Sequence, residues 1–309
     1  MAARALVRIG VIVGCFVATL SSAGAVSFSF SEVVGDSLTD AQAAAFATAA
    51  AAWSAVLTDP VSVAINIGFR DLGAGSAGGT VLGATSASFG TVTFAQFAAG
   101  LAADASSGLD RTAVAHLPGT PPSDRVALTT AQARAVGFGT GAGSDGTIEF
   151  TSNPKISFAT TRPDLAAGRY DLIGVAEHEI GHLLGFQSSL DSGLDAGSAT
   201  RSALDVFRYA GLGAPGFTAG QAAYFSVDGG ATSLGGFSVG GSGQYQASHW
   251  LQGTGGLMDP AVAAGVAQDI TPRDVLALDA VGWDVTEPAS AAVLRAGLGA
   301  LGLWRLRAG

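Results

Sequence analysis

The sequence predicts an α+β fold, and three observations lead to that prediction. An Ala-rich helix and several alternating strands come early in the chain, one apolar helix lies near the middle, and the segments after it are irregular and rich in glycine. The 309 residues are 48% apolar, which is enough for one large domain with a buried core. We therefore expect an N-terminal mixed β-sheet lobe that carries the central helix, an irregular C-terminal lobe, and a cleft between the two.

The N-terminal half begins with a helix whose start is marked by a capping box. Thr39 and Gln42 have the required spacing, and Phe46 and Trp53 belong to the apolar face of a helix over 40–57. Alternating apolar and small residues then predict strands. The expected order is a strand over 61–69, a strand over 80–86, a short helix over 92–103, a loop over 118–125 and a strand over 147–150.

The C-terminal half contains the central helix and fewer regular elements. This helix is expected to follow residues 169–173 and to end at Gly185, because glycine tolerates the backbone conformation of a sharp turn. A hairpin is expected over 224–234, with a tight turn at Asp228-Gly229. Thr271 followed by Pro272 predicts the start of a last helix, which ends before Gly282.

The first 25 residues are typical of a secretory signal peptide. Arg4 and Arg8 precede an apolar stretch over 9–20, and Ala23-Gly24-Ala25 is a small-x-small cleavage site. The alternative is a core helix. We expect residues 1–25 to be removed and the mature chain to start near Val26, outside the cell or on its surface.

Cysteine usage and charge narrow the class of protein further. Cys15, the only cysteine, lies inside the predicted signal peptide, so the mature chain has no disulfide. An exported protein without disulfides is more typical of bacteria than of eukaryotes. The net charge of −9 argues against nucleic acid as a partner.

Residues 286–309 predict a second targeting segment. A Pro-containing motif comes first, an apolar run over 291–304 follows, and basic residues end the chain. This order resembles the PEP-CTERM sorting tail of exported bacterial proteins, although Thr286 replaces a proline and Arg295 interrupts the apolar run. The resemblance implies transient anchoring in a membrane. A plain amphipathic C-terminal helix is the alternative.

The chemistry of the chain centres on His178-Glu179-Ile180-Gly181-His182. On a helix, two histidines four residues apart lie on one face, close enough to bind one Zn²⁺ ion. Glu179 lies beside that ion, where it can take a proton from a zinc-bound water molecule. The alternative is a pair of histidines on an ordinary helix face.

The continuation of this segment resembles the metzincin zinc metallopeptidases, whose motif is HExxHxxGxxH. Gly185 stands at the glycine of that motif, but Ser188 stands where the third histidine is expected. A catalytic zinc site needs three protein ligands, so another residue must complete it. His249 is the favoured third ligand, and Asp191, Asp205, Ser188 or no third ligand are the alternatives; His249 would otherwise be a surface histidine beside Trp250.

A split site explains the missing histidine. Gly256-Leu257-Met258-Asp259-Pro260 looks like a Met-turn, a tight turn whose methionine packs beneath the metal, and it follows His249. In this order the chain is similar to the leishmanolysin-type metzincins, in which a long insertion separates the glycine from the third histidine. The resemblance covers about residues 170–285. The chain also resembles a bacterial family of exported proteins with a HEIGHxLGF motif and a PEP-CTERM tail.

These resemblances imply that residues 26–285 form a zinc metallopeptidase catalytic domain. Its expected activity is hydrolysis of peptide bonds in extracellular proteins or peptides, with Glu179 as the general base. We expect an extended substrate to add as a strand to residues 147–150. Pro260 stands where astacin- and serralysin-like enzymes have a tyrosine, so another group or water must stabilise the oxyanion. His116 is interpreted as structural or incidental. The alternatives are a catalytically inactive extracellular binding or matrix protein on a metzincin scaffold, and a structural adhesin without metal.

Overall fold

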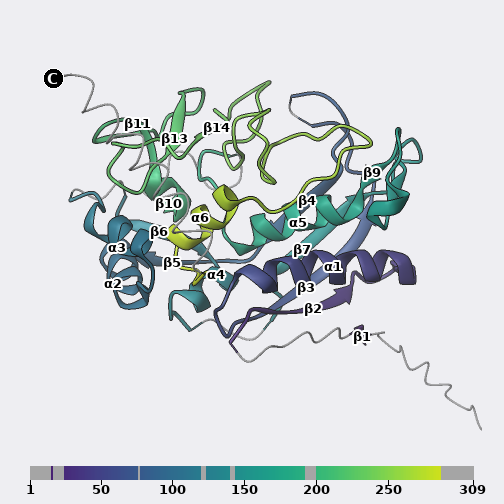
Figure 1. Cartoon of the computed structure of the whole chain (residues 1–309), viewed down its shortest axis with the longest axis horizontal. Helices are drawn as coiled ribbons and strands as arrows, with labels where there is room; N and C mark the ends of the chain where they lie inside the picture. Colours follow the sequence, from purple (N-terminus) through teal and green to yellow (C-terminus); the bar gives the residue numbers. More distant parts are fainter. Residues whose placement is uncertain are drawn as a thin grey trace, which may run out of the picture.

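The computed structural model describes residues 15–16, 24–75, 77–119, 123–139, 143–191 and 200–286. The predicted α+β class is confirmed: helices and several sheets alternate along the described chain (Figure 1). Most of the predicted signal peptide and all but the first residue of the predicted sorting tail lie outside the described residues. Among the described residues, no helix has the length and hydropathy needed to cross a membrane.

The largest sheet has the strand order β1-β2-β3-β7-β4. β2 (Ser27–Glu32), β3 (Ser62–Arg70) and β7 (Gly146–Thr151) are parallel to one another, whereas β1 (Cys15–Phe16) and β4 (Gly83–Ala87) are antiparallel to their neighbours. The expectation that residues 147–150 bind substrate as a sheet edge is wrong. β7 is hydrogen-bonded to β3 on one side and to β4 on the other, so its backbone is already used.

Two helices that lie side by side cover this sheet, α1 (Asp40–Val56) and α5 (Leu172–Leu184) (Figure 1). The predicted capping box of α1 is present, with Thr39 and Gln42 bonded to each other's backbone amides. Phe46 of α1 packs on Phe150 of β7 with ring centroids 4.9 Å apart. The indole of Trp53 donates a hydrogen bond of 2.9 Å to the carbonyl of Glu177, which attaches α1 directly to α5.

A second, three-stranded sheet has the order β10-β6-β5. The predicted helix over 92–103 is α2 (Phe94–Asp104), since residue 93 ends a strand and caps the helix. The remaining elements of this part are β5 (Phe89–Thr93), α3 (Gly108–Ala115), β6 (Arg125–Thr129), α4 (Thr130–Ala135), β8 (Phe158–Ala159), a 3-10 helix over Arg162–Asp164, β9 (Tyr170–Asp171) and β10 (Thr200–Ser202).

The described chain after residue 203 contains only short elements. They are a 3-10 helix over Leu204–Phe207, β11 (Arg208–Gly211), β12 (Ala214–Pro215), β13 (Ala223–Phe225), β14 (Gly235–Phe237) and α6 (Pro272–Ala280). The predicted hairpin exists, but its second strand begins at Gly235, which pairs with Phe225. The prediction of a tight turn at Asp228-Gly229 is therefore wrong. Asp228 instead accepts hydrogen bonds from Ser226 and Thr232 inside a longer loop.

Candidate metal centre

The central helix α5 carries the histidine motif and ends where expected, at Gly185. This residue has φ of +123°, a conformation that residues with a side chain rarely adopt. A Cβ atom there would also lie 2.9 Å from Cδ of the buried Gln132. Glycine is thus required twice, by the backbone turn and by the close neighbour. The turn directs the chain away from the helix towards Phe186.

Three histidines meet at one point although His249 is far from the helix in sequence. Their Nε2 atoms form a triangle: His178 to His182 is 3.1 Å, His182 to His249 is 3.2 Å, and His178 to His249 is 3.3 Å. In a tetrahedral site with Zn–N bonds of about 2.0–2.1 Å, two ligand nitrogens lie about 3.3–3.4 Å apart. The cluster can therefore hold one metal ion, and its spacing fits three corners of a tetrahedron.

The second ring nitrogen of each histidine, Nδ1, is hydrogen-bonded to a main-chain carbonyl and so orients the ring. Nδ1 of His178 donates to the carbonyl of Leu257 at 2.8 Å, and Nδ1 of His182 donates to that of Phe186 at 2.7 Å. Nδ1 of His249 lies 3.2 Å from the carbonyl of Gln246. Because a carbonyl only accepts, each Nδ1 carries the proton and each Nε2 presents its lone pair to the centre. Such outer hydrogen bonds are what metal-binding histidines require.

Burial keeps the two deepest imidazoles neutral. His182 and His249 are only 8% and 7% exposed. Burial, together with the neighbouring His178, lowers the pKa of His182 to about 3. Burial and the two neighbouring histidines lower the pKa of His249 well below its ordinary value. Neutral imidazole is the form that binds a metal, so both rings are ready to bind one at neutral pH.

The predicted Met-turn lies directly beneath the helix. Met258 is fully buried, and its main-chain carbonyl accepts a hydrogen bond of 2.9 Å from the amide of Trp250. A Cβ atom at Gly181 would lie only 2.7 Å from Sδ of Met258. Because Gly181 has no side chain, the side chain of Met258 can pack directly against the helix there. The same turn supplies the carbonyl of Leu257 that orients His178.

The carboxylate of Asp274 holds this turn in place, a role that was not predicted from the sequence. It is fully buried in α6 and accepts the indole N–H of Trp250 at 2.7 Å and the amides of Leu257 and Met258 at 3.1 and 3.3 Å. It also caps α6 through the amide and hydroxyl of Thr271. The sequence signal was the acid at the third position of that helix, which indicates a cap but not its second set of partners.

Glu179 lies between the histidines and β4. It is 5% exposed, and the hydroxyl of Thr85 lies 2.8 Å from both its Oε2 and its main-chain oxygen. Burial raises the pKa of Glu179, while His178 and the Thr85 hydrogen bond act in the opposite direction. A Cβ atom at Gly83 would lie 2.7 Å from Oε1 of Glu179. The strand is thus bare of a side chain where the carboxyl group approaches it.

The alternative third ligands lie outside the histidine cluster. Asp205 accepts hydrogen bonds from the hydroxyl of Ser188 at 2.8 Å and from the amide and hydroxyl of Ser189 at 2.7 and 2.6 Å. The two carboxylate oxygens of Asp191 accept backbone amides of residues 247 and 248. His116, the remaining histidine, is the C-cap of α3, and its Nδ1 lies 2.8 Å from the carbonyl of Thr112.

A cleft opens in front of the cluster. Residues 77–85 and 259–262 line this cleft, together with Tyr245, Gln246, Ser248 and His249. The two charged groups that line the cleft apart from Glu179 and the histidines are already engaged. Arg70 forms an ion pair of 2.6 Å with Glu149, and Asp259 accepts the amides of Gly253 and Gly255.

Comparisons with known proteins add no assignment: no protein-family model matches this chain, and neither a curated protein nor a solved structure resembles it at a significant level.

Proposed function

We propose that this protein is an exported zinc-dependent endopeptidase, with His178, His182 and His249 as metal ligands and Glu179 as the general base. The observation that carries the proposal is the triangle of Nε2 atoms with edges of 3.1–3.3 Å, next to a buried glutamate that follows the first histidine in sequence. A zinc ion there would polarise the scissile carbonyl and lower the pKa of a water molecule toward about 7.

The number of ligands favours catalysis over a structural role. Structural zinc sites are closed by four protein ligands, whereas catalytic sites have three and keep one position open. Within the described parts of the chain, the histidine cluster contains three ligand residues, all histidines. The cleft in front of them provides room for a substrate and a water molecule.

Glu179 is suited to move the proton in this reaction. Its pKa is raised by burial, which makes the carboxylate a stronger base than an exposed glutamate. The Thr85 hydroxyl restricts the carboxyl group to the side of the cleft that faces β4. From there Glu179 would accept the proton of the attacking water and return it to the leaving amine.

An extended peptide is the substrate that this cleft fits best. β4 is the last strand of its sheet and pairs with β7 on one side, and its residues Gly83, Ala84 and Thr85 line the cleft. Unpaired N–H and C=O groups of an edge strand can bind a peptide as an added strand. Of the charged side chains that line the cleft, Arg70 is paired with Glu149 and Asp259 is held by backbone amides, which favours uncharged residues near the scissile bond.

The metzincin resemblance supports the same function. Gly185 turns the chain out of the helix, His249 reaches the two helical histidines, and Met258 packs under Gly181, as that family's order of motifs implies. Signal-peptide export, location outside the cell and a sorting tail belong to this proposal as well.

The test is zinc content and protein cleavage by the purified protein. We expect one equivalent of zinc and hydrolysis of casein in the wild type, and unchanged zinc with loss of most cleavage in Glu179→Gln, which keeps the size and removes the base. Asp124→Asn, an exposed carboxylate outside the cleft, is the matched control. Zinc binding without Glu179-dependent cleavage would instead indicate a non-catalytic extracellular binding protein, and absence of zinc after reconstitution would indicate a metal-free adhesin.

A further inference from the structure

The third histidine reaches the cluster on a segment that is neither helix nor strand. His178 and His182 are held by α5, but residues 246–249 have no regular element to hold them. The carbonyl of His249 accepts the amide of Ser238, and this bond lies on the far side of the residue from Ala247 and Ser248. The position of His249 must then depend on whatever holds the backbone just before it.

Asp191 holds the backbone before His249 through two main-chain amides of that segment. Its Oδ1 accepts the amide of Ala247 at 2.6 Å, and its Oδ2 accepts the amide of Ser248 at 2.9 Å. Ala247 and Ser248 are buried, so water cannot replace these bonds at no cost. One carboxylate thus binds two consecutive peptide units directly before the histidine.

Arg208 holds the same segment through the main-chain carbonyl of Ala247. Its Nη1 donates to the carbonyl of Ala247 at 3.1 Å, and its Nη2 donates to the carbonyl of Ser238 at 2.6 Å. The guanidinium is 1% exposed and lies over the ring of Phe237 at 4.7 Å from its centroid. Ala247 therefore has both polar main-chain atoms bonded to charged side chains, which is a strong and directional restraint.

The position of Asp191 in the chain explains why its hydrogen bonds to residues 247 and 248 matter for the histidine cluster. It follows α5 by only a few residues, beyond Ser188 and Ser189, which the buried Asp205 holds. Asp191 thereby connects the segment that leaves the helix of the first two histidines to the segment that carries the third.

We propose that Asp191 and Arg208 are positioning residues for His249, which set the third side of the metal triangle without touching the metal. The proposal rests on the proposed metal site. It predicts that the two residues affect metal affinity only through His249.

The experiment measures the affinity of the purified full chain for Zn²⁺ alone, in competition with a chromophoric chelator. Asp191→Asn is expected to weaken zinc binding by about 10–100-fold, as changes behind a metal ligand commonly do. In the His249→Ala background the same substitution should change the remaining affinity by less than about twofold, because its effect passes through the missing histidine. Co²⁺ bound to Asp191→Asn should show an altered visible spectrum, since the ligand geometry changes.

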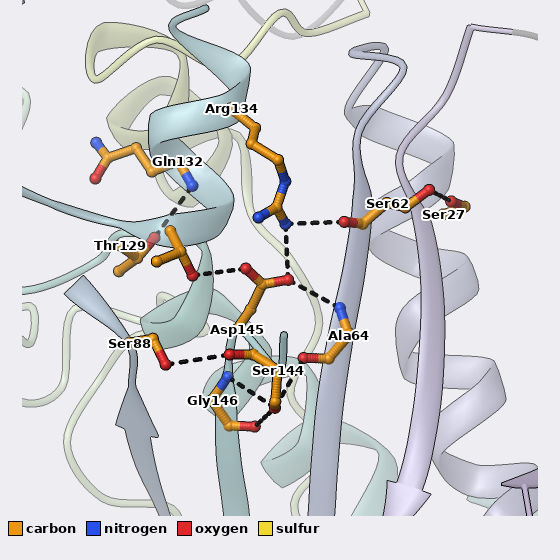
Figure 2. Close-up of polar contacts among 11 residues, drawn as sticks. Ser27, Ser62, Ala64, Ser88, Thr129, Gln132, Arg134, Ser144, Asp145 and Gly146 are labelled. Carbon is orange, nitrogen blue, oxygen red and sulfur yellow. Dashed lines mark hydrogen bonds and ion pairs between the residues drawn. The ribbon is translucent and has the colours of Figure 1, made fainter. Parts of the chain in front are cut away.

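The matched control is Asp145→Asn (Figure 2). Asp145 is also a buried carboxylate that accepts a backbone amide, that of Ala64 at 2.9 Å, and it pairs with Arg134 at 2.7 Å, but it lies at the amino-terminal edge of β7. Its substitution removes comparable buried contacts and should leave zinc affinity and the Co²⁺ spectrum unchanged. Arg208→Met is the second variant, used if Asp191→Asn does not fold, with the same expected pattern.

The outcomes separate this inference from the proposed function. A wild type that binds zinc, with an Asp191→Asn variant of equal affinity, overturns the positioning role and leaves the metal site standing. An equal loss in the presence and absence of His249 also overturns it, because Asp191 would then act as a ligand or on the fold as a whole. A wild type that binds no zinc overturns the metal site and the positioning role together.

Discussion

His249 is the residue on which the candidate site depends most. Its ring closes the triangle that α5 leaves open, and burial lowers its pKa so that the Nε2 lone pair is available. Gly83 and Gly181 matter because they have no side chain. Glu179 lies close to Gly83, and Met258 lies close to Gly181. At the residue scale, the candidate site depends on three Nε2 atoms that lie 3.1–3.3 Å from one another.

Replacing the third ligand should remove tight metal binding. We expect His249→Ala to lower zinc affinity by more than about a hundredfold, because two histidines on one helix leave half of a four-coordinate site open. His116→Ala changes an exposed helix cap and should leave the affinity unchanged. Competition with a chelator measures both. Equal affinities in the two variants would exclude His249 as a ligand.

Adding a methyl group at Gly83 should separate catalysis from metal binding. Its Cβ would lie 2.7 Å from Oε1 of Glu179, so the carboxyl group has to move away from β4. We expect Gly83→Ala to lower kcat by about tenfold or more, since misplacement of a general base is costly. Zinc content should stay the same. Gly90→Ala, where a Cβ meets nothing within 4 Å, is the control. An unimpaired Gly83→Ala enzyme would show that Glu179 does not need this position.

At the scale of elements, one buried carboxylate joins α6 to the turn at Leu257 and Met258. Asp274 caps its own helix and also accepts the amides of Leu257 and Met258 and the indole of Trp250. Trp250 follows His249, and the carbonyl of Leu257 orients His178. The last helix of the described chain is therefore attached to the segments that hold two of the three clustered histidines, although it contributes no histidine itself.

Loss of this carboxylate should destabilise the fold. Asp274→Asn turns an acceptor into an amide whose N–H₂ group faces buried N–H donors, and we expect unfolding to become easier by about 2–4 kcal/mol. Calorimetry of the metal-free protein measures the change. Asp269→Asn, whose side chain is 78% exposed, should cost far less. A melting temperature that is the same for both variants would contradict the role assigned to Asp274.

At the scale of the whole molecule, a group of acidic side chains joins distant parts of the chain. Asp59, Asp104 and Asp284 have carboxylate oxygens within 4.8 Å of one another, and Asp279 of α6 interacts electrostatically with Asp284. Burial, with the neighbouring acids, raises the pKa of Asp59 and of Asp104 to about 7 and that of Asp279 to about 9. Folding therefore takes up protons here.

The pH dependence of stability follows from these shifts. A carboxyl group with a raised pKa in the folded state stabilises the fold at low pH, and this stability is lost as pH rises through the folded pKa. We expect the free energy of unfolding to fall from about pH 4, the ordinary pKa of aspartate, to about pH 7 through Asp59 and Asp104, and on to about pH 9 through Asp279. Asp104→Asn should flatten this fall and be more stable than the wild type at pH 8, as urea denaturation can measure. Asp124→Asn should follow the wild-type curve; a steeper fall in Asp104→Asn would contradict the assignment.

Local patterns in the sequence predicted a large part of the fold. Thr39 with Gln42, Gly185, and Thr271 with Pro272 mark the ends of three helices correctly, because capping depends on residues within one turn of each other. The alternation over 61–69 predicted β3 for a similar reason. Strands β5 and β6 and helices α3 and α4 were not predicted, since each is short and is stabilised by neighbours distant in sequence.

The sequence by itself determined that two histidines share one face of a helix, because a spacing of four residues has only one outcome on that helix. It also offered His249, Asp191, Asp205 and Ser188 as candidates for the third ligand, and only the tertiary structure decided among them. His249 meets the cluster, while the two aspartates and the serine are used in hydrogen bonds to other groups. Likewise, the neighbours of β7 on both sides decided that residues 147–150 are interior to the sheet. The physical reason is common to both cases: a contact between residues far apart in the chain depends on how whole segments pack, and no local pattern encodes it.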